Sequence, residues 1–201
     1  MVAPRAPALR LVRWTPAFHA KLVERPAAIS RMALPARRAE LREFLKRGSA
    51  EARVHDQFVP SFDTPPFRVT RFSDGSFPAF YVAKDPDVAL SEKLYHDRRY
   101  FLGLAPVRVP GPHALELMTL GVTARVVDLR GARGATDPTS YARTHRMATA
   151  ARMRGADGVL YSSVRAGGGD CLALFTATVL QAPAIHRAVV VEWDGLEFLW
   201  P

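Results

Sequence analysis

The sequence predicts an α+β domain with a mixed, partly antiparallel sheet and flanking helices, preceded by an N-terminal helical appendage. From residue 52 onward, short runs rich in β-branched and aromatic residues alternate with turns that contain Gly or Pro, which is typical of a sheet. Two longer segments carry helix signals instead, one over 85–100 and one over 137–155. We therefore divide the chain into an appendage over 1–48 and a main domain over 49–201.

Two helices are predicted within the N-terminal quarter. The segment 15–24 begins with Thr15 as a helix cap and Pro16 at the first helical position. The segment 35–48 has an amphipathic pattern and ends at a Gly. Its apolar residues at helical spacing are Leu41, Phe44 and Leu45. These residues need an apolar cover, so the appendage is expected to form a docking or oligomerisation surface.

The positive charge of the chain is concentrated in the same quarter. The net charge is +9, and residues 1–50 hold eleven Lys and Arg against three Asp and Glu. One interpretation is a solvated helical face, and the alternatives are contact with an acidic protein or with nucleic acid. No zinc-finger spacing, helix-turn-helix pattern or interleaved aromatic pattern supports base recognition, so direct nucleic-acid contact is not expected.

Composition is consistent with a globular protein of the cytoplasm. At 48% hydrophobic residues, the 201-residue chain can bury a substantial core. The single cysteine, Cys171, excludes an intrachain disulfide and is expected to be a buried apolar residue. No run of residues has the length and character of a transmembrane helix or a secretory signal, so no membrane partner is expected.

The stretch 67–92 is predicted to organise the functional site. It reads as a strand, a Gly-containing turn, a second strand at 79–83 and the start of a helix, with Asp85 as N-cap and Pro86 at the first helical position. A cation, an aromatic ring and a carboxylate come from these neighbouring elements and are expected to converge on one cleft. They are Arg71, Tyr81 and Glu92. Such a set can hold a phosphorylated, ring-containing ligand and act on a sugar carbon.

Further strands and one helix complete the predicted domain. The second helix is expected to be capped by Asp137 and to end before Gly155. The predicted strands lie at 114–120, 122–129, 158–164 and 171–180, with a closing hairpin formed by 188–193 and 196–200.

Several common chemistries find no support in the sequence. The glycines of the RAGGGD segment are not followed by the Lys-Ser/Thr pair of a phosphate-binding P-loop. The six His residues have no metal-ligand spacing, so no metal is expected. The Gly-x-Ser-x-Gly elbow of α/β-hydrolases is also missing.

Four ordered fragments resemble the RES domain family, which is named for its Arg, Glu and Ser residues. They are RVH at 53–55, TRFS at 70–73, FYVAKDPDVALSE at 80–92 and ADGVLYSSVRAGGGDCLALF at 156–175. The resemblance implies a fold similar to ADP-ribosyltransferases and consumption of NAD, by phosphorolysis or by transfer of ADP-ribose to a protein. Members of the family are commonly toxins of Xre–RES toxin–antitoxin pairs.

The resemblance also implies the site residues. Arg53 stands where the family has an early Arg, and Arg71 stands within Val69-Thr70-Arg71-Phe72-Ser73, where the family has Gly-Gly-Arg-Trp-Asn. The chain lacks the two Gly residues of the family segment and has Phe72 and Ser73 in place of its Trp and Asn. These differences lie in the segment that is expected to surround the cofactor. The implied catalytic residues are Arg71, Glu92 and Ser163, with Ser162 as an alternative serine. The implied NAD-binding residues are Arg53, Arg71, Phe72, Tyr81 and Ser163.

The chemistry of NAD cleavage suits these residue types. Nicotinamide leaves as a neutral molecule, and the transition state resembles an oxocarbenium ion that a carboxylate such as Glu92 can stabilise. Arginines can clamp a diphosphate bidentately. The expected function is therefore NAD phosphorolysis by a toxin, with NAD as substrate, phosphate as co-substrate and an Xre-type antitoxin or a second copy of the chain as partner. The alternatives are protein ADP-ribosylation and a non-catalytic basic binding module.

Overall fold

The computed structural model describes residues 10–14, 19–24, 50–52, 62, 65–103, 109–137 and 140–200. Within them, one mixed sheet runs in the order β1-β6-β7-β8-β4-β2-β5-β9-β10, and β3 pairs with β9 outside this path. Its strands are β1 Arg10–Trp14, β2 His19–Glu24, β3 Ala50–Ala52, β4 Phe80–Ala83, β5 Gly111–Val122, β6 Ala124–Asp128, β7 Gly158–Ser162, β8 Asp170–Leu174, β9 Leu180–Trp193 and β10 Phe198–Leu199. The helices are α5 Pro86–Leu102 and α6 Ala142–Met153, with a short 3-10 turn η1 at Ala177–Val179.

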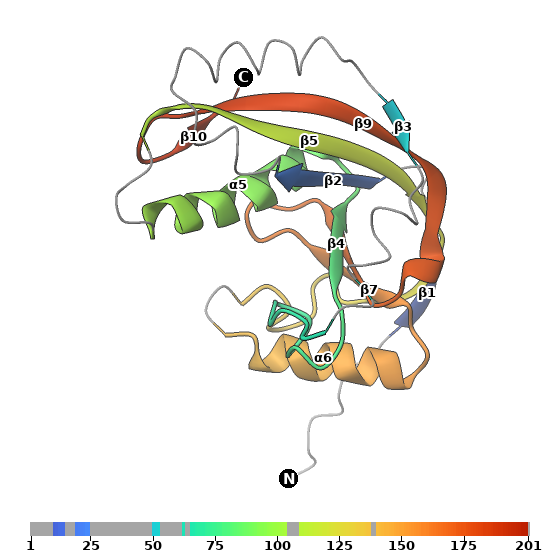
Figure 1. Cartoon of the computed structure of the whole chain (residues 1–201). Helices are drawn as coiled ribbons and strands as arrows, with labels where there is room; N and C mark the ends of the chain where they lie inside the picture. The colour runs from blue at the N-terminus through green and yellow to red at the C-terminus, as the bar shows by residue number, and fades with distance from the viewer. Residues whose placement is uncertain are drawn as a thin grey trace.

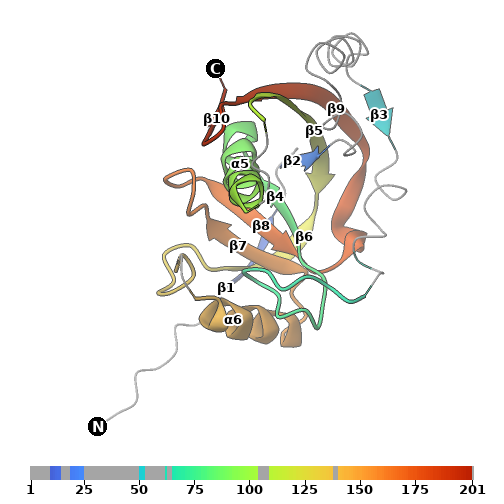
Figure 2. The same cartoon turned by 60° about the vertical axis from the view of Figure 1, so that its left-hand side comes forward.

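The arrangement confirms the predicted α+β class with a mixed sheet. The pair β6–β7 is parallel and is connected through α6, whereas the other pairs are antiparallel. The long strands β5 and β9 curve over α5, and α6 lies at the opposite end of the molecule, beneath β7 (Figure 1). A view turned by 60° shows α5 beside β2 and β4 (Figure 2).

The core has two parts, one on each face of the sheet. Alternation along β4 sends Phe80 and Val82 to one cluster and Ala83 to the other, where Tyr81 also packs. The second cluster also contains buried side chains of α5 and α6, including Leu94 and Ala148, so both helices cover the same face. The residues of β4, β7 and β8 that face the helices therefore become available to line a site.

The predicted module of β4 followed by a helix is confirmed. Asp85 has an extended backbone, and its side chain accepts a hydrogen bond from the amide of Asp87 at 2.8 Å, which caps α5. Pro86 is the first residue of the helix, where its missing N–H costs nothing. The helix continues two residues beyond the predicted end at Tyr100 and is capped by Gly103.

The prediction of a strand before this module was wrong. Residues 67–73 contain no strand, and a single bridge between Thr70 and Ser73 closes a turn at 71–72. The backbone carbonyls of Thr70 and Arg71 accept hydrogen bonds from His145 and Thr144 of α6. Because side chains of a helix satisfy these carbonyls, the segment needs no neighbouring strand.

The start of α6 also differs from the prediction. The helix begins at Ala142, and its N-cap position, Tyr141, makes no side-chain capping bond. The Asp137 carboxylate instead accepts from the amide of Ser140, so it closes a turn ahead of the helix. The predicted stop is confirmed, since Gly155 follows α6 with a φ of +70°, a conformation that favours glycine.

Two strand predictions near the C-terminus have different outcomes. The expected strand over 171–180 was too long, because β8 ends at Leu174 and the Thr176 side chain caps η1. The closing hairpin is confirmed: β9 and β10 pair in antiparallel fashion around Asp194 and Gly195.

The helix predicted over 15–24 was wrong. Its second half is strand β2, which pairs with β5 along all six of its residues and with β4 at Ala20. Strand β1 pairs with β6. The pairing of β2 with two neighbouring strands therefore outweighs the local signal for a helix cap. The predicted helix over 35–48 lies outside the described residues, and the division of the chain at residue 48 stays a prediction.

Candidate active site

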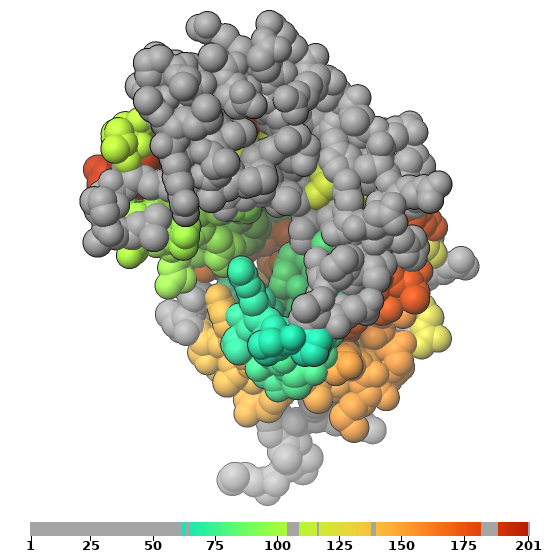
Figure 3. All heavy atoms as spheres, in the orientation of Figure 1, coloured from blue at the N-terminus to red at the C-terminus, as the bar shows by residue number. Residues whose placement is uncertain are grey.

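A cavity of about 550 Å³ opens between α5, the helix-facing side of the sheet and the turns that precede β4. The space-filling view shows the surface hollowed beside α5, next to the segment that follows residue 65 (Figure 3). Arg71, Tyr81 and Glu92, which the sequence predicted to converge, all line it. The described residues that line it are Arg68, Val69, Thr70, Arg71, Tyr81, Val82, Ala83, Ala89, Glu92, Lys93, His96, Arg99, Tyr141, Tyr161, Arg165 and Cys171.

Sheet register builds the floor of this cavity. Tyr81 on β4, Tyr161 on β7 and Cys171 on β8 lie on the face that the helices cover. Tyr161 is directly opposite Cys171, and the rings of Tyr81 and Tyr161 meet edge to face with centroids 6.5 Å apart. The floor is therefore aromatic, and it can pack against a planar ring.

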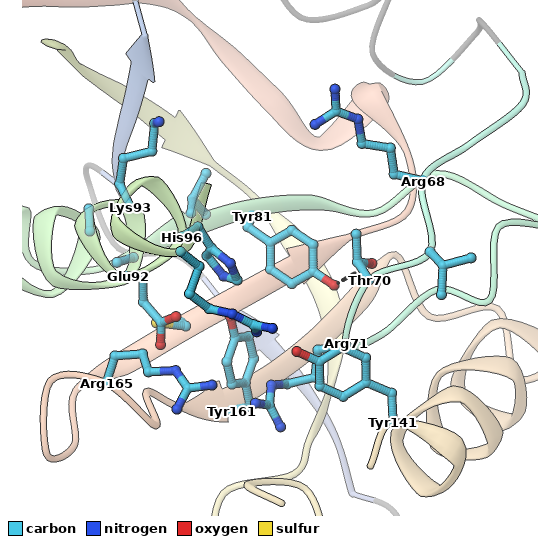
Figure 4. A pocket seen from close by; sticks show the side chains of 16 residues that line it. Arg68, Thr70, Arg71, Tyr81, Glu92, Lys93, His96, Tyr141, Tyr161 and Arg165 are labelled. Atoms are coloured by element: carbon cyan, nitrogen blue, oxygen red, sulfur yellow. Dashed lines mark hydrogen bonds between the residues drawn. The ribbon is translucent and has the colours of Figure 1, made fainter. Parts of the chain in front are cut away.

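Hydrogen bonds fix the orientation of Tyr81. Its hydroxyl accepts from the backbone amide of Phe72 at 3.0 Å and donates to the Thr70 hydroxyl at 2.8 Å (Figure 4). Burial raises the pKa of Tyr81 to about 12, so the phenol stays protonated at neutral pH. Tyr81 can therefore position a ligand but is not suited to act as a base.

Arg71 is anchored from the side of α6. Its Nη1 donates to the carbonyl of Asp137 at 2.6 Å, and its guanidinium carbon lies 5.0 Å from the centroid of the Tyr141 ring. Only part of the guanidinium takes part in these contacts. The remaining N–H groups can bind an anion in the cavity, with the cation already held in place.

Glu92, on α5, is oriented by a serine that directly follows β7. The hydroxyl of Ser163, just after β7, donates to Oε1 of Glu92 at 2.7 Å. The Ser163 hydroxyl oxygen also accepts hydrogen bonds from the backbone amides of Arg165 and Ala166 at 3.1 and 3.0 Å. Ser163 is 5% exposed and is not among the described residues that line the cavity, so its hydroxyl faces Glu92, and its predicted role in NAD binding and catalysis stays a prediction.

The alternative serine lies elsewhere. Ser162 is the last residue of β7 and stands opposite Asp170 in the register of β7 and β8. The side chain of Ser163, and not that of Ser162, is hydrogen-bonded to Glu92. The geometry therefore favours Ser163 as the serine of this site.

Another predicted NAD-binding residue, Phe72, is not among the described residues that line the cavity. Phe72 is fully buried, and its ring packs against that of Tyr161 with centroids 4.7 Å apart, so it supports the floor from behind. The contact of its side chain with NAD stays a prediction. Arg53 lies outside the described residues.

Sequence reasoning missed several lining residues. His96 and Arg99 follow Glu92 at helical spacing on α5, and this periodicity was a usable signal. Burial lowers the pKa of His96. Tyr161 could have been placed by alternation along β7, since it lies two residues before Ser163. Tyr141 and Arg68 come from irregular segments, and no local pattern marks them.

The cysteine in the floor is a buried thiol, as the sequence predicted. Cys171 is 2% exposed, and burial raises its pKa to about 12. It is therefore a weak nucleophile at neutral pH. Among the described residues, no group of three His, Cys, Asp or Glu side chains is arranged to hold a metal ion, and neither helix is long and apolar enough to cross a membrane.

Comparison with known proteins identifies the family. A family model described as the RES domain matches residues 49–194, which is most of the chain. The crystal structure of the M. tuberculosis MbcT-MbcA toxin-antitoxin complex contains a chain with 16% sequence identity and a TM-score of 0.48, covering 90% of this chain and 86% of that one. A search of curated proteins finds no match.

Proposed function

We propose that this chain, which belongs to the RES domain family, consumes NAD by breaking the bond between nicotinamide and ribose, with inorganic phosphate as acceptor. The observation that carries the proposal is the Glu92 carboxylate, held by Ser163 inside a cavity that Arg71 and Tyr81 also line. A carboxylate, an anchored arginine and an aromatic floor are the three groups that this reaction needs.

Glu92 supplies the electrostatic part of the chemistry. As the bond between nicotinamide and the ribose carbon lengthens, its electron pair leaves with the nicotinamide nitrogen and positive charge develops on the ribose. A fixed carboxylate stabilises that charge more in the transition state than in the ground state. The hydrogen bond from Ser163 fixes the carboxylate beforehand, so little reorganisation is needed during the reaction.

The other groups bind and orient the substrate. Arg71 holds the diphosphate, because a guanidinium anchored on the Asp137 carbonyl still has donors for a bidentate contact. Tyr81 and Tyr161 offer an aromatic surface to the nicotinamide ring. A cavity of about 550 Å³ lies within the usual range for small-molecule sites.

The biological role that this reaction supports is that of a toxin. Depletion of NAD stops growth, so the activity requires restraint by a partner that covers the cavity. Membership of the RES family supports an antitoxin of the Xre type as that partner and the cytoplasm as the place of action.

Product analysis of the purified protein tests the proposal. The protein is incubated with NAD, with and without inorganic phosphate, and nicotinamide and the ADP-ribose product are separated by chromatography. We expect nicotinamide release that depends on phosphate, together with phosphorylated ADP-ribose. The exposed Glu192, changed to Gln, is a matched control for Glu92→Gln.

The alternatives give different products. Attachment of the labelled ADP-ribose part of NAD to a protein would indicate an ADP-ribosyltransferase. Free ADP-ribose formed in the presence of phosphate would indicate hydrolysis. An unchanged NAD concentration with folded protein would refute the proposed activity and leave a binding module as the interpretation.

A further inference from the structure

The cavity holds more positive charge than a bound NAD molecule uses. Among the described residues that line it, four are arginines and one, Glu92, is a carboxylate, and the single lysine of this set, Lys93, forms an ion pair with Asp97. The arginines are Arg68, Arg71, Arg99 and Arg165. NAD brings two negative charges on its diphosphate and one positive charge on its nicotinamide ring. The excess of cations favours a second anion beside the dinucleotide.

One of these arginines is built into the end of the cavity that contains the carboxylate. Arg165 lies in the loop between β7 and β8, and its guanidinium carbon is 3.6 Å from the centroid of the Tyr95 ring of α5. Stacking at this distance restricts the side chain without using its N–H donors. Arg165 therefore presents a pre-oriented cation, as Arg71 does on the opposite wall.

The two cations face each other across the cavity. In the close view, Arg165 and Arg71 point toward one another from opposite sides, with Glu92 on the side of Arg165 and Tyr141 on the side of Arg71 (Figure 4). Their anchors differ accordingly: Arg71 is fixed on the carbonyl of Asp137 and Arg165 on α5. The cavity thus has two anion-binding ends, and only the end with Arg165 contains the carboxylate.

Ser163 connects Arg165 to Glu92. Its hydroxyl accepts from the amides of Arg165 and Ala166 and donates to Glu92, so one oxygen sets both the start of the loop and the carboxylate. A group bound by Arg165 is therefore held in a fixed relation to the reacting carbon that Glu92 faces. Arg71, on the other wall, is anchored on the carbonyl of Asp137 instead.

We propose that Arg165 binds the acceptor phosphate, whereas Arg71 binds the diphosphate of NAD. This assignment rests on the proposed function. In the step it serves, a phosphate oxygen donates an electron pair to the ribose carbon, while the carbon–nitrogen bond breaks and its electron pair leaves with nicotinamide. The guanidinium holds the phosphate and thereby raises its local concentration at that carbon.

Substitution of Arg165 separates the two anion sites. Initial rates of the full chain are measured against inorganic phosphate at saturating NAD and against NAD at saturating phosphate. For Arg165→Gln we expect a KM for phosphate that rises at least about tenfold, a KM for NAD within about threefold of the wild type, and a larger share of hydrolysed product. Arg165→Lys should recover part of the phosphate affinity. Arg146→Gln, at an exposed position of α6 outside the cavity lining, is the matched control.

A direct binding measurement keeps this test independent of turnover. Broadening of the ³¹P resonance of inorganic phosphate is followed with wild type, Arg165→Gln and Arg146→Gln. The inference predicts broadening by the wild type and the control, and its loss in Arg165→Gln, even if NAD turns out not to be the substrate. Equal broadening by all three proteins, no broadening by the wild type, or a rise in the KM for NAD alone would overturn it.

Discussion

Two carboxylates on the same helix show how surroundings decide what an acid can do. Glu92 faces the cavity and accepts a hydrogen bond from the neutral Ser163 hydroxyl. Asp97, five residues further along α5, is 6% exposed; it is bound by Lys93 and lies 3.5 Å from Nε2 of His113. Glu92 keeps a negative charge available to a ligand, whereas the charge of Asp97 is matched within the protein.

The two surroundings predict separate effects on activity and stability. Burial raises the pKa of the Asp97 carboxyl, but the contact with His113 and the ammonium of Lys93 outweigh it and hold the pKa below its ordinary value. Asp97 is therefore charged in the folded protein and stabilises it. Glu92 contributes its charge to the ligand instead, and its loss should cost the fold little.

Glu92→Gln should have the largest effect. The amide keeps the shape of the side chain and can still accept from Ser163, but the charge that faces the ribose is lost. We expect NAD cleavage to fall at least about a hundredfold, which corresponds to about 3 kcal/mol of transition-state stabilisation. Thermal unfolding should change by no more than about 2 °C. A folded variant that cleaves NAD within threefold of the wild type would remove Glu92 from this role.

Asp97→Asn should show the opposite pattern. The amide leaves Lys93 without its buried counter-charge, and we expect the free energy of unfolding to fall by about 2 kcal/mol. Denaturant titration measures this loss. Activity per folded molecule should stay within about threefold of the wild type, and a large loss of activity at full stability would show that Asp97 belongs to the site.

Ser163→Ala should reduce activity about tenfold, since the carboxylate stays charged but loses the donor that orients it. The Ser163 hydroxyl also accepts hydrogen bonds from two backbone amides, so the substitution can affect stability as well. Unfolding is therefore measured alongside turnover. Ser162→Ala is the matched control and should leave turnover within about twofold of the wild type. Equal losses in both variants would indicate a general effect on the loop after β7.

The smallest expected effect is a loss of folding free energy at acid pH, caused by protonation of Asp97. A carboxyl with a depressed folded-state pKa contributes stability that is complete above its unfolded-state value, about 4, and is lost as the pH falls through the folded-state value. The difference in unfolding free energy between wild type and Asp97→Asn should therefore be constant from pH 5 to 7 and shrink below about pH 4. If this difference in unfolding free energy is unchanged down to pH 3, protonation of Asp97 is not coupled to folding.

The sequence predicted those parts of the site that local signals specify. Asp85 and Pro86 mark the start of α5, and with the start fixed, helical spacing places Glu92 at the cavity. The role of Ser163 depends on a contact between residues 71 positions apart, which no local pattern contains. The same limit explains β2, where a capping signal at Thr15 suggested a helix but pairing with β5 determines the structure. The turns around Arg71 depend in the same way on side chains of α6.

The crystal structure of Glu92→Gln with intact NAD tests the central claim most directly, because this variant should bind the substrate without cleaving it. We predict that the nicotinamide ribose lies against residue 92, that the nicotinamide ring packs on Tyr81 and Tyr161, and that Arg71 contacts the diphosphate. NAD bound outside this cavity, or bound within it with its adenosine end at residue 92, would contradict the account.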